Sequence, residues 1–112
     1  MTKKFIKNIE FSQALALADQ VAYQPGQVVS LTFVQNPALS LTLFAFAKGE
    51  GVSTHSAPGD AMAYILDGTA EITVGDQKMT AGAGQAVVMP ADIPHALEAV
   101  ENFKMLLILV KQ

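Results

Sequence analysis

The chain has 112 residues, the length of a single domain, and 51% of them are hydrophobic against 15% charged, which excludes a disordered chain. It contains no cysteine, which excludes disulfides, thiolate chemistry and cysteine-bound zinc. The net charge is −3, and the seven basic residues are scattered lysines. This pattern argues against a nucleic-acid partner, and the lack of arginine excludes guanidinium clamping of a phosphate.

Residues 1–26 are predicted to form an N-terminal arm. Its start is basic, but no long apolar stretch follows, so we expect no signal peptide. A short helix over 11–21, or an edge strand, is the expected structure, because Pro25-Gly26 ends whatever forms. The longest apolar run, 105–110, is too short to cross a bilayer, so we predict a cytoplasmic protein without a membrane partner.

Residues 27–112 are predicted to form a β-sandwich or β-barrel. Asn36-Pro37, Asp67-Gly68 and Gly75-Asp76 are turn signals, and such signals recur about every 8–12 residues, as is typical of a sandwich or barrel. The predicted strands cover 28–34, 39–47, 61–66, 71–74, 86–89, 95–100 and 103–110.

Two of these segments, 41–47 and 105–110, carry apolar residues on both faces. A sheet with one solvated face would alternate apolar and polar residues, so these strands are expected to be covered on both sides. The opposite sheet would cover one face, and a second subunit would cover the other, which predicts a homodimer. Alternatively, the N-terminal segment covers the outer face.

Two segments, 49–68 and 84–95, each place a histidine after a glycine- or proline-rich turn, and His55 and His95 are the two histidines of the chain. Both segments resemble the paired motifs of the cupin family. The resemblance implies an all-β, antiparallel barrel of the jelly-roll type, built from two packed sheets. In a complete cupin site, three imidazoles and one carboxylate hold a divalent metal. The matching residues are Gly49, His55 and Gly68 in the first motif, and Gly84, Pro90 and His95 in the second.

The chain departs from these motifs where the family has further ligands. The second histidine of the first motif falls at Ala57, the glutamate at Ala61, and the asparagine of the second motif at Ala99. The position at which the family has a glycine in the second motif is occupied by Asp92. Without the carboxylate, a dication in an apolar barrel loses its charge compensation, so its affinity should be below that of a full site.

Asp60 is the one nearby substitute for the missing carboxylate. Strand alternation turns it outward, but a bulge after Pro58-Gly59 would turn it inward. In that case His55, Asp60 and His95 would be a two-histidine, one-carboxylate metal set. Otherwise Asp60 accepts backbone hydrogen bonds in the turn.

A cavity is predicted between the sheets, and three functions remain open for it. The first is a metal-dependent cupin enzyme, an oxygenase or isomerase, with iron, manganese, nickel or zinc on His55 and His95. The second is a binding module that takes a small organic molecule without metal or chemistry. The third, metal-free acid–base catalysis by the two histidines, lacks a cationic residue to polarise a substrate. The predicted pocket-lining residues are Ala57, Ala61, Ala63, Ile65 and Met89.

Overall fold

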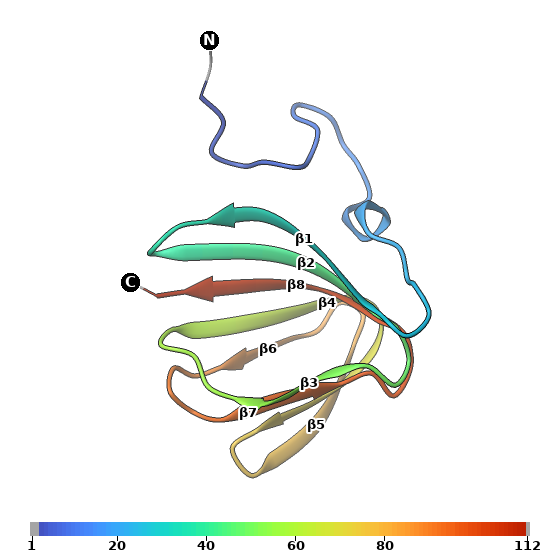
Figure 1. Cartoon of the computed structure of the whole chain (residues 1–112), viewed down its shortest axis with the longest axis vertical. Helices are drawn as coiled ribbons and strands as arrows, with labels where there is room; N and C mark the ends of the chain where they lie inside the picture. The colour runs from blue at the N-terminus through green and yellow to red at the C-terminus, as the bar shows by residue number, and fades with distance from the viewer. Residues whose placement is uncertain (1–2, 112) are drawn as a thin grey trace.

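Residues 3–111, which the computed structural model describes, form a curled antiparallel sheet that closes into a partial barrel (Figure 1). The predicted all-β class is confirmed. The elements are a 3₁₀ turn η1 (Leu17–Gln20) and the strands β1 (Val28–Gln35), β2 (Leu39–Phe46), β3 (Gly51–His55), β4 (Asp60–Val74), β5 (Gln77–Gly82), β6 (Ala86–Met89), β7 (His95–Glu98) and β8 (Phe103–Val110).

Strand β4 belongs to both halves of the barrel. Its first part pairs with β8 and β6, and its second part pairs with β5 and β7. The first sheet therefore runs β1-β2-β8-β4-β6, whereas β3, β7 and β5 join β4 in the second. Figure 1 shows the two sheets facing each other, with β4 passing from one to the other.

The prediction of a turn at Asp67-Gly68 is wrong, because both residues lie within β4, a single strand of 15 residues. The pairing with β8 shifts register between Ile65 and Asp67, which marks a bulge. Gly68 has a φ of 73°, a left-handed conformation that glycine adopts without steric cost. A bulge followed by this glycine bends the strand from one sheet into the next, which is a common way to turn a barrel corner.

The barrel interior holds the main hydrophobic core. Phe46 and Phe103 are fully buried there, and their rings stack with centroids 4.6 Å apart. Ala61, Ala63 and Ile65 of β4 face the same interior, so β4 contributes every second residue to the core. The interior side of the first sheet thus combines Ala61, Ala63 and Ile65 of β4 with large residues of the neighbouring strands β8 and β2.

The N-terminal segment covers part of the outer face of the first sheet. Leu43 and Ala45 of β2 alternate with the interior residues and are nevertheless fully buried, because Val21 packs against them. The hydroxyl of Tyr23 donates a hydrogen bond to Asp67 at 2.5 Å and anchors this segment to the β4 bulge. The segment therefore explains the apolar outer face of β2.

The helix expected over 11–21 is reduced to the four-residue η1 turn. Ser12 has a φ of 61°, and Ala16 and Val21 on either side of η1 are extended, so no longer helix forms. Leu17 and Val21 pack against the outer face of the sheet instead, and this tertiary contact outweighs the helix-tolerant composition. Within residues 3–111, none of the helical segments has the length and hydrophobicity needed to cross a bilayer.

Candidate functional site

The pairing of β3 with β7 places His55 directly opposite His95. Facing side chains on one side of an antiparallel pair lie close together, so residues 40 positions apart in sequence become neighbours. Their Nε2 atoms are 3.1 Å apart, and the ring centroids are 4.3 Å apart with the planes at 71°. The two imidazoles therefore converge on one point.

The other nitrogen of each ring faces a backbone carbonyl. His55 Nδ1 lies 2.9 Å from the oxygen of Ser53, and His95 Nδ1 lies 3.2 Å from the oxygen of Ile93. Because a carbonyl oxygen can only accept, both Nδ1 atoms must carry the proton in these hydrogen bonds. When both rings are neutral and protonated at Nδ1, each directs an unprotonated Nε2 toward the other. Two lone pairs at 3.1 Å repel unless a positive species, either a proton or a metal ion, lies between them.

The two histidines differ in burial. His95 is 4% exposed, whereas His55 is exposed at the edge of the barrel. Burial lowers the pKa of His95 below its ordinary value of 6.5, and proximity to His55 lowers it further. His95 is therefore neutral near pH 7.

The pair fits a metal ion in geometry but supplies only two ligands. The 3.1 Å between the two Nε2 atoms is short enough for one ion to contact both, because metal–imidazole bonds are about 2.1 Å long. Metal-binding histidines usually donate the hydrogen of their other ring nitrogen to a carbonyl or carboxylate oxygen, and both Nδ1 atoms have such a carbonyl here. Among residues 3–111, no third histidine, aspartate or glutamate joins the pair in a cluster that could hold a metal. Most coordination positions would thus be left to water or to a bound molecule.

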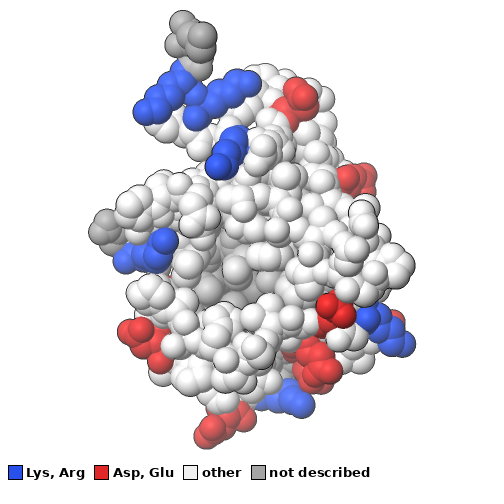
Figure 2. Space-filling model, in the orientation of Figure 1, with Lys and Arg blue, Asp and Glu red and all other residues white. Residues whose placement is uncertain are grey.

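A cavity of about 190 Å³ lies next to the histidine pair, between the two sheets. Apart from the histidines, its walls are entirely apolar. Figure 2 shows a hollow near the middle of the molecule, bordered by uncharged atoms, with the charged side chains around the periphery. The lining residues are Phe44, Phe46, Val52, His55, Ala57, Ala61, Met89, His95, Leu97, Met105, Leu107 and Leu109.

The structure places the predicted pocket residues in two groups. Ala57, Ala61 and Met89 line the cavity. Ala63 and Ile65 face the same interior but lie further along β4, in the fully packed core. The difference arises because only the start of β4 borders the cavity, whereas the following inward-facing residues are covered by the packed core.

Asp60 is exposed, and its Oδ1 accepts a hydrogen bond of 2.8 Å from the amide of Ala91. It therefore ties the start of β4 to the β6–β7 loop, and it stands outside any metal-binding cluster of the described residues. A second contact between the same loops, from the Asp92 amide to the Ala57 oxygen, is also 2.8 Å long. These two bonds fix the loop that precedes His95.

Asp92 takes over the backbone role of the motif glycine that it replaces. Its φ is 63°, in the left-handed region that glycine favours and that aspartate tolerates better than most residues. The loop can therefore keep its course into β7, and His95 keeps its inward direction despite the substitution.

The sequence did not reveal the wall that β2 and β8 contribute to the cavity. Phe44, Phe46, Leu107 and Leu109 line it, but their neighbours Leu43 and Leu106 are apolar as well. When both faces of a strand are apolar, alternation cannot identify the face that points inward. The pairing of β2 with β8, which sets Leu43 opposite Leu106, is the information that resolves the direction.

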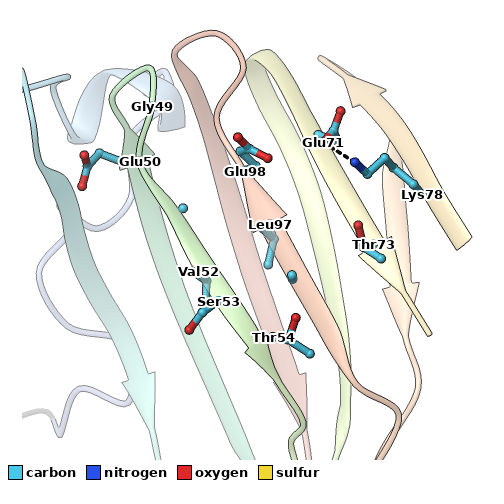
Figure 3. Close-up of a pocket in the computed structure, with 12 residues that line it drawn as sticks. Gly49, Glu50, Val52, Ser53, Thr54, Glu71, Thr73, Lys78, Leu97 and Glu98 are labelled. Carbon is cyan, nitrogen blue, oxygen red and sulfur yellow. Dashed lines mark ion pairs between the residues drawn. The ribbon is translucent and has the colours of Figure 1, made fainter. Parts of the chain in front are cut away.

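A larger hollow of about 420 Å³ lies on the outer face of the second sheet (Figure 3). Glu71 of β4 and Glu98 of β7 border it, and they alternate with the buried Ile72 and Leu97, so they face away from the core. Lys78 lies 3.3 Å from Glu71 and offsets its charge. This surface is polar and carries no buried chemical group, so we place the candidate site in the smaller interior cavity.

Comparison with known proteins supports this architecture. The family model described as a cupin domain matches residues 42–111. A conserved protein of unknown function from Streptococcus pyogenes is 46% identical, with 100% of this chain and 98% of that chain covered and a TM-score of 0.97. A cupin superfamily protein from Desulfitobacterium hafniense is 34% identical, with 96% and 98% covered and a TM-score of 0.91.

A cupin 2 conserved barrel domain protein from Leptotrichia buccalis is 49% identical over 85% of this chain, which corresponds to 46% of that longer chain, with a TM-score of 0.83. No curated protein is significantly similar to the sequence.

Proposed function

The chain belongs to the cupin domain family, and on this premise we propose that its barrel binds a small organic molecule at a two-histidine centre that holds one divalent transition-metal ion. The observation that carries the proposal is the convergence of the two imidazole Nε2 atoms, 3.1 Å apart, at the polar end of an apolar cavity. Iron, manganese, nickel and zinc all accept imidazole nitrogen. Such an ion, when bound, supplies a Lewis acid with several open positions.

The protein's own groups have separate roles in this proposal. The carbonyl oxygens of Ser53 and Ile93 hold both imidazoles in the tautomer that presents Nε2. His55 lies at the accessible edge, and His95 lies inside, so a ligand enters past the first ring and reaches the second. The apolar walls exclude water and strengthen every electrostatic contact at the pair.

Nitrogen NMR tests the centre directly, because the chain has only two histidines and gives two sets of imidazole signals. We expect both rings to show protonated Nδ1 and, on addition of zinc, both Nε2 resonances to shift together. Calorimetry should show one zinc per chain, with binding lost in His55→Ala and in His95→Ala. Asp60→Asn is the matched control, and its zinc affinity should stay within twofold of the parent.

Protonated Nε2 on both rings, or no binding of zinc, iron(II), manganese(II) or nickel(II) at millimolar concentration, would refute the metal centre. A second candidate, a metal-free binding module, would then replace it. Among the residues that the structure describes, no carboxylate joins the pair, which favours this alternative because a dication retains its full charge there. In that case a proton shared between His55 and His95 resolves the repulsion of their lone pairs.

We also propose that the protein forms a homodimer through the outer face of the first sheet. The N-terminal segment covers β2, but Met62, Tyr64 and Val88 on β4 and β6 remain 38–52% exposed. Phe5 and Phe11 of the same chain's arm are also exposed, at 77% and 46%, so each copy offers both an apolar face and an apolar arm to a second copy.

Sedimentation tests this interface. We expect a dimer for the parent and a folded monomer for Tyr64→Asp combined with Val88→Asp. Val28→Asp, at an exposed position on the edge strand β1, should leave the dimer intact. A monomeric parent chain at micromolar concentration would contradict the proposal.

A further inference from the structure

We infer that the ligand of the interior cavity is a compact organic monoanion: one carboxylate or phenolate on an apolar body the size of a single six-membered ring. The inference rests on the proposed cation at the histidine pair, and it deepens that proposal by naming a ligand class. Three properties of the cavity define this class, namely its volume, the chemistry of its walls and its charge.

The volume sets the size of the ligand. A cavity of about 190 Å³ is somewhat larger than the engineered cavities of about 150 Å³ that hold benzene. One ring with one small substituent therefore fits. Ala57 and Ala61 create much of this space, because the larger cupin ligand residues that the motif has at these positions would occupy it.

The walls exclude a hydroxylated body. Besides the two histidines, the lining consists of aliphatic, aromatic and thioether side chains, with no hydroxyl, amide or charged group among the described lining residues. Each ligand hydroxyl placed against such a wall loses its hydrogen bonds to water and gains none, which costs about tenfold in affinity or more. Sugars and polyols are therefore poor ligands for this barrel. Met89 and Met105 add flexible contacts that can adapt to a ring.

The charge requirement follows from the histidine pair. A cation between His55 and His95 leaves net positive charge at one end of an apolar cavity, and within residues 3–111 no lining carboxylate offsets it. A buried charge needs a partner, and the open positions at the pair are where a ligand can supply one. One anionic group directed at the Nε2 atoms completes the site, whereas a second anionic group would lie against apolar walls without a partner.

Three probes of one ring size separate these properties on the zinc-loaded full chain. Benzoate carries the anion and the apolar body, benzamide lacks the charge, and shikimate keeps the carboxylate but adds three ring hydroxyls. We expect benzoate to shift the amide resonances of cavity residues on both sheets, with benzamide and shikimate each binding at least tenfold more weakly.

The cavity itself is tested by filling it. Ala57→Leu should weaken benzoate binding at least tenfold while zinc affinity, measured separately by calorimetry, stays within twofold of the parent. Ala57 is half-buried, and Ala61→Leu serves as a second filling variant at another lining position. Ala86→Leu adds the same group at an exposed position on β6 and should change neither affinity.

The outcomes separate this inference from the proposal on which it rests. Loss of zinc binding in the parent chain refutes the metal centre, and with it the reason for an anionic ligand. If zinc binds normally, either of two results overturns the ligand class alone. Shikimate or benzamide binds as tightly as benzoate, or benzoate binding is unchanged in both filling variants.

Discussion

Replacing Ala61 by glutamate should convert the two-ligand centre into a three-ligand centre. Ala61 is 3% exposed and shares the cavity wall with both histidines, so a longer side chain at this position extends into the space beside them. We expect Ala61→Glu to bind zinc about a hundredfold more tightly than the parent chain.

The magnitude follows from the charges. Two unit charges about 4 Å apart interact by about 4 kcal/mol at an effective dielectric constant near 20, so a carboxylate and a dication gain about 8 kcal/mol. Desolvation of the carboxylate offsets several kcal/mol of this gain. About 3 kcal/mol remains, which corresponds to about a hundredfold in the dissociation constant. Without metal, the buried polar group should destabilise the fold by about 1–3 kcal/mol.

Calorimetry with zinc gives the affinity, and urea unfolding with and without zinc gives the stability. Ala61→Gln is the matched control, because it has the size and polarity of glutamate without the charge. We expect both variants to be destabilised without metal and only the glutamate to bind zinc more tightly. If folded Ala61→Glu binds zinc no better than Ala61→Gln, the reasoning about a missing carboxylate at this centre is refuted.

Three further predictions concern stability. Tyr23→Phe should lower the free energy of unfolding by about 1 kcal/mol in urea titrations, because it removes the hydrogen bond to the Asp67 carboxylate. Burial, followed by this carboxylate, raises the pKa of Tyr23, so the parent should also lose stability above about pH 10, and the variant should lose less. Burial lowers the pKa of His95, so the metal-free protein should lose stability as the pH falls below 6.5, and His95→Leu should flatten this dependence. Gly68→Ala should cost several kcal/mol more in thermal unfolding than Gly26→Ala, since both have positive φ but only Gly68 faces overlapping backbone.

Each of these predictions has a result that contradicts it. An unchanged alkaline transition in Tyr23→Phe would show that another group causes it. Equal pH profiles for the parent and His95→Leu between pH 7 and pH 5 would remove the stated role of His95 burial. Equal losses in the two glycine variants would mean that the backbone of Asn102 moves aside from the new methyl group at position 68.

The sequence alone determined the class of the fold and the two histidines of the candidate site. Turn signals and strand propensity predict most of the strands, because each strand and the turns that bound it lie within about ten residues of sequence. The motif glycines and the two histidines give the family, since their spacing is preserved even where the ligands are not. The missing carboxylate at Ala61 is also visible directly in the sequence.

Tertiary structure decided what local signals cannot contain. The turn signal at Asp67-Gly68 became a bend within β4, because pairing with β8 on one side and β5 on the other holds the strand together. The helix-tolerant N-terminal segment became a cover for β2, because burial of Val21 outweighs propensity. Most important, the tautomers of His55 and His95 and the 3.1 Å between their Nε2 atoms depend on two carbonyls and one strand register. Those contacts form only when β3 and β7 pair, so the chemistry of the pair follows from the fold and not from the residue types alone.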